Sequence, residues 1–218
     1  QVRRIKEGML EPRIGALVVG QSPRLEIDRE FQRLAKGSAR LVLKGALDGF
    51  SRDELELFQP EDNKDALFTR LPSGEGISLS KKQVILNGAD KLKKLKMSGV
   101  DVVMMLCTGT FPEWKDFKGV LFPSNTLSSM VRGYLTNGKI CVFSPLQRQC
   151  AASQLRWEDN GYNVISLPLL PNATKEEAVL AGQAAGRHDL DLIILDCISY
   201  TSETKKIIRE TTGVPVIL

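Results

Sequence analysis

The chain has 218 residues, of which 42% are hydrophobic, and this length suits one α/β domain or two small lobes with a substantial core. A balance of 30 Lys and Arg residues against 26 Asp and Glu residues gives a net charge of +4, without the concentrated basic surface of a nucleic-acid-binding protein. No apolar run approaches the roughly 20 residues of a membrane span, and the first residues lack the apolar core of a signal peptide.

Apolar runs alternate with helical patterns in the first half of the chain. The turn Gly20-Gln-Ser-Pro-Arg24 leaves the first strand, and Pro23 suits a first helical turn. Ser51 and Glu54 form a capping box, and Ser80 caps a long helix. The predicted elements are a strand at 13–19, a helix ending near 36, a strand at 40–43, a short helix from 51, a hairpin of 67–71 and 76–79, a helix at 80–96 and a strand at 100–106.

The alternation continues to the last residues. The predicted strands are 119–122, 140–143, 164–167, 192–195 and 214–217, and the predicted helices are 124–135, 145–160, 174–187 and 201–212. Repeated βα units predict an α/β fold with mainly parallel sheets and helices on both faces. The aromatic segment 111–118 is long for a βα loop, and it either covers the sheet edge as a lid or packs onto the core.

Two stretches share one pattern, Asp101–Thr110 and Asp191–Ser199. Each is an apolar run that ends in a cysteine, Cys107 or Cys197, and then breaks into small hydroxyl-bearing residues. Such runs indicate strands buried on both faces of a parallel sheet, so both cysteines lie at strand carboxyl ends, where ligands bind in open α/β sheets. The repetition predicts two pseudo-symmetric lobes whose thiols face one another across a cleft.

Two opposed thiols suit proton transfer at a carbon atom. An unperturbed thiol has a pKa of about 8.5, so one thiol can act as a thiolate base while the other donates a proton. Backbone amides at Thr108-Gly109-Thr110 and at the helix start near Thr201 favour the thiolates and could hold a substrate carboxylate. Strand alternation predicts that the Asp196 side chain points away from Cys197.

The turn Gly20-Gln21-Ser22 follows the first strand and lies on the same predicted edge of the sheet. Its position suits anion binding, although the turn forms neither a dinucleotide-binding fingerprint nor a Walker loop. The sequence therefore predicts an anion-binding turn and gives no support for a nucleotide cofactor.

The 4 cysteines lack paired Cys-x-x-Cys spacing, which argues against a zinc site and a disulfide framework. We expect reduced thiols in a cytoplasmic protein and no metal. A cysteine at the end of an apolar strand is often a core residue, and this alternative stays open for Cys107 and Cys197. Cys141 and Cys150 are expected in the core, and His188 is expected at a helix end on the surface.

Four motifs together resemble one known family, AroM, over nearly the whole chain from about Arg13. They are Gly20-Gln-Ser-Pro-Arg24, Leu79-Ser-Lys-Lys82, Leu106-Cys-Thr108 and Leu195-Asp-Cys197. AroM-like proteins are in turn distantly similar to the aspartate/glutamate racemase superfamily, whose cofactor-free enzymes use two cysteines on facing flavodoxin-like lobes. The resemblance implies that Cys107 and Cys197 are the two bases. It also implies a substrate carboxylate near Gly20, Gln21, Ser22, Thr108 and Ser199.

These inferences predict one lobe of residues 1–123 with 213–218, a second lobe of residues 124–212, and an active-site cleft between them. The predicted function is a cofactor-independent, metal-free racemase or isomerase that acts on a small carboxylate by two-cysteine α-proton transfer. Two alternatives stay open, a one-cysteine lyase or decarboxylase and a non-catalytic small-molecule-binding or regulatory protein. The expected partner is a small carboxylate rather than nucleic acid or a membrane, and a homo-oligomer stays open.

Overall fold

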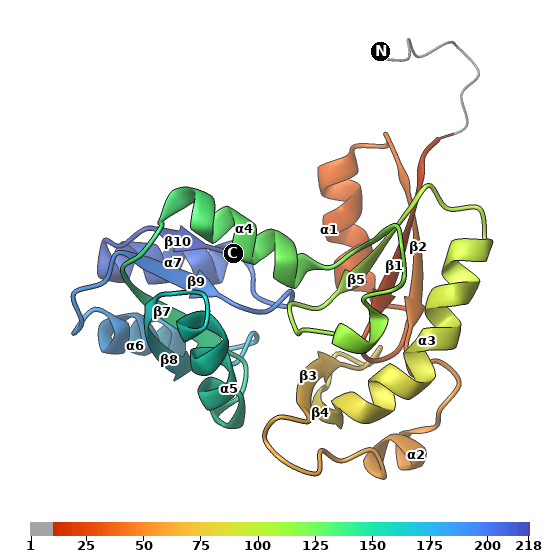
Figure 1. Cartoon of the computed structure of the whole chain (residues 1–218), viewed down its shortest axis with the longest axis horizontal. Coiled ribbons are helices and arrows are strands. Elements are labelled where there is room, and N and C mark those ends of the chain that lie inside the picture. The colour runs from red at the N-terminus through yellow and green to blue at the C-terminus, as the bar shows by residue number, and fades with distance from the viewer. Residues whose placement is uncertain (1–10) are drawn as a thin grey trace.

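Apolar runs rich in valine, isoleucine and leucine form two sheets of four parallel strands in the computed structural model, which describes residues 11–218 (Figure 1). A separate hairpin of two antiparallel strands completes the β-structure of the described residues. The strands are β1 Arg13–Val18, β2 Arg40–Gly45, β3 Ala66–Arg70, β4 Gly76–Ser80, β5 Val102–Leu106, β6 Val120–Leu121, β7 Lys139–Ser144, β8 Asn163–Pro168, β9 Leu192–Leu195 and β10 Val216–Ile217.

Helices flank each sheet, as the alternating pattern predicts. They are α1 Leu25–Ala35, α2 Arg52–Glu56, α3 Lys81–Met97, the 3-10 turn η1 Pro112–Trp114, α4 Pro123–Tyr134, α5 Gln147–Glu158, α6 Lys175–Ala185 and α7 Ser202–Thr212. The Ser51 capping box is confirmed, and the Ser80 hydroxyl accepts a hydrogen bond from the Gln83 amide at 3.3 Å. The predicted hairpin is confirmed as the β3–β4 pair. No helix within residues 11–218 is long and apolar enough to cross a membrane.

The two sheets repeat one strand order. The first sheet has the order β2-β1-β5-β6, and the second, read from its other edge, has the order β8-β7-β9-β10. Strands β5 and β9 therefore occupy equivalent positions, each beside the first strand of its sheet. Because Cys107 follows β5 and Cys197 follows β9, the two cysteines lie at equivalent strand ends. The pseudo-symmetric α/β lobes predicted from the repeated cysteine pattern are thus present.

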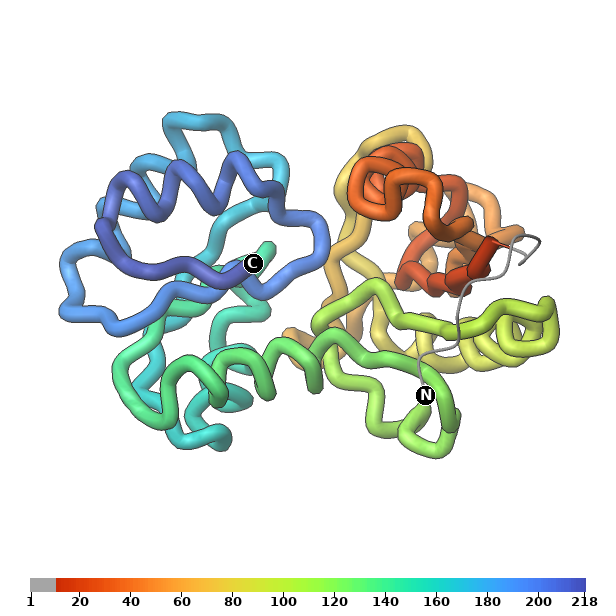
Figure 2. Tube along the Cα trace, turned by 90° about the horizontal axis from the view of Figure 1, so that it is seen from above, coloured from red at the N-terminus to blue at the C-terminus, as the bar shows by residue number. Residues whose placement is uncertain are grey.

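Each sheet is covered on both faces by apolar side chains from its helices. On the first sheet, the larger core includes Leu92 and Leu95 of α3, together with Trp114 of η1, while Ile27 of α1 packs on the opposite face. On the second sheet, Trp157 of α5 and helix α4 cover one face, and helices α6 and α7 cover the other. Helix α4 runs from the first lobe to the second and joins them (Figures 1 and 2).

The last strand corrects the predicted lobe boundary. The sequence predicts residues 213–218 in the first lobe, but β10 pairs with β9 of the second sheet, where Val216 lies beside Ile193. Helix α7 packs against α6 and returns the chain next to β9, so Val216 enters the core that contains Phe143 and Ile208. The short strand joins the second lobe because the Val216 side chain is buried among apolar side chains there.

The close packing of α3 against η1 generates a stability prediction. Replacing Gly88 by alanine would place Cβ 2.8 Å from the ring of the fully buried Trp114. Alanine gains about 1 kcal/mol of helix propensity over glycine, but overpacking costs about 1–3 kcal/mol. We expect Gly88→Ala to destabilise the fold by about 1 kcal/mol in urea unfolding. Gly133→Ala in α4 is the control, since no atom lies within 4 Å of its added Cβ, and it should not destabilise.

Candidate active site

Cys107 and Cys197 line the same cavity, which has a volume of about 220 Å³. Each residue is only partly buried and leaves a strand carboxyl end, Cys107 after β5 of the first lobe and Cys197 after β9 of the second. Both cysteines also line a second cavity of about 20 Å³, roughly the space of one water molecule. The parallel sheets thus bring two residues that are distant in sequence to one point between the lobes.

Each thiol accepts a backbone hydrogen bond from its own loop. The Gly109 amide donates to Cys107 Sγ at 3.3 Å, and the Ser199 amide donates to Cys197 Sγ at 3.5 Å. The two contacts have the same spacing of two residues along the chain, so the pseudo-symmetry extends to the immediate surroundings of the sulfur atoms. These amides favour the thiolate forms. Gly109 is one of the amides that the sequence predicts for Cys107, whereas Cys197 accepts from Ser199 and not from the predicted helix start near Thr201.

Burial nevertheless raises the pKa of both thiols. For Cys107, desolvation outweighs the Gly109 amide and the positive charges of Lys81 and Arg156, and the pKa lies above the ordinary value. For Cys197, desolvation and the neighbouring Cys107 raise the pKa to about 12, against the effect of the Ser199 amide. The electrostatic coupling means that ionisation of one thiol opposes ionisation of the other.

Two cationic side chains, Lys81 and Arg156, line the cavity beside Cys107. Lys81 is the first residue of α3, and its Nζ atom lies 5.7 Å from the ring centroid of Phe111. Lys64 also lines the cavity and is exposed. Asp196 is the one carboxylate among the lining residues, and it is paired with Arg156. The lining therefore carries more positive than negative charge.

Arg156 of α5 connects the two cysteine loops. Its Nη1 atom donates to the Thr108 carbonyl at 2.8 Å, and its Nη2 atom forms an ion pair with Asp196. The Thr108 hydroxyl donates to the Asp196 carbonyl at 3.2 Å, which adds a direct bond between the lobes. The Asp196 carboxylate also accepts a hydrogen bond from the Trp157 indole at 3.2 Å. These contacts join the residue after Cys107 to the residue before Cys197.

The predicted binding residues fall into two groups, and the first lies in the cavity. Thr108-Gly109-Thr110 lines the 220 Å³ cavity with the thiols. Ser199 and Thr201 instead line a separate groove of about 640 Å³, together with Arg24. The Thr201 hydroxyl caps α7 by accepting from the Thr204 amide at 3.1 Å. Ser199 approaches the thiols through its amide and through the 20 Å³ cavity.

The turn Gly20-Gln21-Ser22 does not line either cavity that contains the thiols. The Gln21 amide group donates to the Phe50 carbonyl at 2.6 Å, and the Ser22 amide and hydroxyl donate to the Asp48 carboxylate at 2.7 and 2.8 Å. An added Cβ on Gly20 would lie 2.8 Å from the Thr69 side chain. The polar groups of this turn brace the first lobe, whereas the sequence predicts that they contact a ligand.

Several cavity residues were not predicted as site residues. Lys81 lies within the Leu79–Lys82 motif. That motif indicated the family of the chain, but it did not indicate that Lys81 lies beside Cys107. Arg156 and Gln149 lie on the polar face of α5, and no sequence feature separates them from ordinary surface residues. Gln149 donates to the Ala66 carbonyl at 3.0 Å and so adds another bond between the lobes.

The other cysteines, the histidine and the aromatic segment lie in the core or on the surface and not in the cavity. Cys141 and Cys150 are buried as expected, and His188 is exposed near the end of α6. The segment 111–118 packs onto the core, with Phe111 and Trp114 buried and stacked at a ring-centroid distance of 4.8 Å. Within residues 11–218, no three His, Cys, Asp or Glu side chains are grouped as metal ligands.

Solved structures with the same two-lobe α/β fold include enzymes that act on small molecules. Arylmalonate decarboxylase matches with a TM-score of 0.60 and 16% identity, over 94% of this chain and 86% of that chain. An aspartate racemase homologue from Pyrococcus horikoshii OT3 matches with a TM-score of 0.54 and 9% identity, over 96% and 93%. Allantoin racemase from Klebsiella pneumoniae matches with a TM-score of 0.52 and 14% identity, over 94% and 82%.

These likenesses define the class by fold alone, a two-lobe α/β fold that this chain shares with an aspartate racemase homologue and allantoin racemase, as the distant resemblance predicts. The family is shown by sequence, because the model for AroM protein matches residues 14–218. The chain belongs to the AroM family. No curated protein sequence matches the chain significantly.

The raised pKa of Cys197 predicts a loss of stability at high pH. The pKa of Cys197 is about 12 in the folded protein and 9.0 for a free thiol. The folded state therefore keeps its full stability below about pH 9 and becomes less stable, relative to the unfolded state, as the pH rises toward 12. Between pH 7 and pH 10 the wild-type protein should lose unfolding free energy because the Cys197 thiol ionises in the unfolded chain but not in the folded one. Urea unfolding should show that Cys197→Ala makes this loss smaller by about 1.4 kcal/mol, the linkage energy of one thiol at one pH unit above its reference pKa. An identical pH dependence in wild type and variant would contradict the shift.

Proposed function

We propose that the protein is a cytoplasmic, cofactor-independent racemase or isomerase that moves a proton at the α-carbon of a small carboxylate between Cys107 and Cys197. The observation that carries the proposal is the meeting of two strand-end thiols, one from each lobe, in a single cavity. Proton removal from one face of a carbon and return to the other requires two acid/base groups on opposite sides. The presence of one thiol from each lobe in the same cavity supports such an arrangement.

The charges around the thiols support a division of roles. Lys81, Arg156 and the Gly109 amide favour the thiolate of Cys107 but do not outweigh its burial, and Ser199 and Arg70 likewise only partly offset the burial that raises the pKa of Cys197 to about 12. We assign the base role to the thiolate form of Cys107 and the proton-donor role to Cys197, because the charge of Cys107 raises the pKa of Cys197 and keeps it protonated. Cys107 takes the α-proton and becomes a thiol, the bond electrons remain on the substrate as an enolate, and the Cys197 thiol protonates the opposite face and becomes the thiolate.

The lining of the cavity supports an anionic substrate. The ammonium group of Lys81 and the amides of Thr108 and Thr110 can hold a carboxylate and stabilise the enolate that forms from it, while the Gly109 amide donates to Cys107 Sγ. The volume of about 220 Å³ lies below the roughly 300–1,000 Å³ of pockets for drug-sized ligands, which favours a small molecule. Racemases and a decarboxylase share the fold, and they serve as analogies for the chemistry.

One observation favours a second candidate, a decarboxylase or lyase that uses Cys197 alone. A thiol with a pKa of about 12 is protonated at neutral pH and suits the delivery of a proton to a carbanion left by loss of CO₂. In that reaction no base is needed to create the carbanion, so Cys107 is dispensable. The two candidates differ in which cysteine the reaction needs.

The first functional test uses α-proton exchange. A panel of small 2-amino, 2-hydroxy and malonate-type carboxylates is incubated in D₂O, and α-deuterium incorporation and CO₂ release are followed by NMR. For a racemase, we expect both Cys107→Ala and Cys197→Ala to lower exchange by about 10²–10⁴-fold, the usual contribution of one acid/base group. Cys150→Ala is the control and should retain activity, because Cys150 is buried outside the cavity.

Each outcome of this test has one meaning. CO₂ release that needs Cys197 but survives Cys107→Ala identifies the one-cysteine decarboxylase. Tight binding of a carboxylate without exchange or CO₂ release, unchanged by alanine at either cysteine, overturns the enzymatic proposal in favour of a binding protein.

The closeness of the two thiols can be tested without a substrate. A trivalent aryl arsenical, ArAs=O, reacts with two nearby thiols to give ArAs(SR)₂ and water. We expect one arsenical per native chain by intact-mass analysis and its loss in Cys107→Ala or Cys197→Ala. Cys141→Ala serves as the control that should keep the adduct, since Cys141 is fully buried in the second lobe. Absence of the adduct in wild type would mean that the thiols do not face one another.

A further inference from the structure

Arg156 stands out because it contacts the neighbours of both cysteines. It is held on α5 of the second lobe, and it donates to the Thr108 carbonyl of the first lobe at 2.8 Å. Its ion pair with Asp196 reaches the residue directly before Cys197. A single side chain therefore touches the peptide that follows one thiol and the carboxylate that precedes the other.

The surroundings of Arg156 restrain its position. The guanidinium carbon lies 5.3 Å from the Trp157 ring centroid, and the Trp157 indole also donates to Asp196 at 3.2 Å. The side chain of Arg156 is 25% exposed and that of Asp196 is 5% exposed, so the ion pair is shielded from water. A planar guanidinium with several donors suits such a branching contact better than a flexible ammonium group.

The ion pair between Arg156 and Asp196 leaves some of the polar atoms of both side chains without hydrogen bonds. Asp196 Oδ1 and Arg156 Nε are buried and have no hydrogen-bond partner among the described residues. Buried polar atoms are normally satisfied, and a buried ion pair is often replaceable by apolar side chains without loss of stability. Fold stability alone therefore does not account for this ion pair, which lies between the two cysteine loops.

We propose that Arg156 is a positioning residue, which together with Asp196 fixes the spacing of the Cys107 and Cys197 loops and sets the electrostatic field in which Cys107 works. The inference rests on the proposed function, because a fixed spacing matters where two thiols act on one carbon atom. Arg156 is not assigned direct contact with a reacting atom. Its effect passes through the Thr108 peptide, the Asp196 carboxylate and its own positive charge.

The field at Cys107 comes from several elements. Lys81 of α3 and Arg156 of α5 favour the thiolate of Cys107, and burial opposes it. The Cys197 thiol, exposed Lys64 and the Asp196 carboxylate also line the cavity. Removal of Arg156 takes away a positive charge and leaves Asp196 unpaired, so both changes raise the pKa of Cys107. Removal of the Asp196 charge leaves Arg156 unpaired and lowers that pKa.

The test measures alkylation of Cys107 by iodoacetamide, with the Cys107 peptide followed by mass spectrometry between pH 7 and pH 10. Loss of a nearby positive charge shifts a pKa by about one unit, so Arg156→Gln should react about tenfold more slowly at each pH below the midpoint. Asp196→Asn should react several-fold faster. Arg156→Lys keeps the charge and should restore most of the rate, which also covers a Gln variant that folds poorly.

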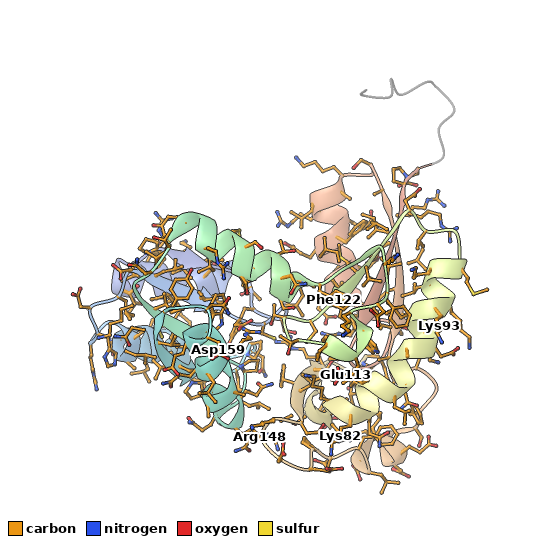
Figure 3. All side chains as sticks on the ribbon, viewed as in Figure 1. Lys82, Lys93, Glu113, Phe122, Arg148 and Asp159 are labelled. Atoms are coloured by element: carbon orange, nitrogen blue, oxygen red, sulfur yellow. The ribbon has the colours of Figure 1, made fainter. Side chains whose placement is uncertain are left out.

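Arg148→Gln is the matched control, because Arg148 lies on the same helix and forms no ion pair with a described residue. Figure 3 shows Arg148 and Asp159 at opposite ends of α5, which places Arg148 far along the helix from its carboxyl-terminal turns. The control should alkylate at the wild-type rate. The opposite signs for Arg156→Gln and Asp196→Asn separate a charge effect from simple loosening, which would make Cys107 more accessible in both variants.

The spacing is read from the arsenical adduct of the two thiols. Arg156→Gln should weaken arsenical binding at least tenfold, Arg156→Lys should weaken it less, and Arg148→Gln should leave it unchanged. Alkylation rates that move in the same direction in Arg156→Gln and Asp196→Asn, or unchanged alkylation and arsenical binding in Arg156→Gln, overturn the inference. Since neither readout needs a substrate, these outcomes are distinct from a failure of the proposed function, which shows as absent proton exchange in wild type.

Discussion

The structure depends on one geometric constraint, which is that the carboxyl edges of two parallel sheets meet. A parallel strand must leave its sheet at the carboxyl edge, and the loops there are free to carry functional residues because the strands already satisfy the backbone of the core. Where these two edges meet, the ends of β5 and β9 line one cavity, and α4 leads the chain from the carboxyl edge of the first sheet to the start of β7 in the second. Hydrogen bonds from Gln149, Arg156 and Thr108 then hold the two lobes together across it.

Burial and charge act against one another at this site. Enclosure between the lobes removes water from the thiols and raises the pKa of both, although each sulfur accepts an amide hydrogen bond and Cys107 lies near two cations. The cost of desolvation for a thiolate is the larger effect here. The proposed anionic substrate would add a further negative charge, and the cations would then both bind it and keep one thiol ionisable.

The sequence was sufficient for the features that local patterns encode. Apolar runs, capping residues and the repeated strand-end cysteine predicted the α/β lobes, the hairpin and the equivalent positions of Cys107 and Cys197. The position of Arg156 could not be predicted, because a charged residue on an amphipathic helix has the same local pattern whether it faces solvent or another lobe. The sheet that β10 joins was predicted wrongly, since two strand residues carry no information on which edge they will pair with.

The turn Gly20-Gln21-Ser22 shows that the place of a turn after a strand is not enough to predict ligand binding. Its place after the first strand was a sound reason to expect a ligand, yet Asp48 and the Phe50 carbonyl take up its hydrogen-bonding groups. Position along the chain identifies the edge of a sheet, but satisfaction of polar groups by neighbouring loops decides which residues remain free to bind. That decision depends on loops far apart in the sequence.

The two lobes repeat one fold, but the charges around their two cysteines differ, and this difference bears on which reaction the site can catalyse. The strand order and the amide contacts are repeated in the two lobes. Two cations, Lys81 and Arg156, favour the thiolate of Cys107, whereas Arg70 favours that of Cys197 and the charge of Cys107 opposes it. A racemase must let its two thiols exchange roles, so any difference between their pKa values has to be small once a substrate carboxylate lies beside the cations near Cys107. A decarboxylase needs no such exchange and gains from a permanent difference. The size of the pKa difference in the ligand-bound state is therefore the quantity that separates the two reactions on this fold.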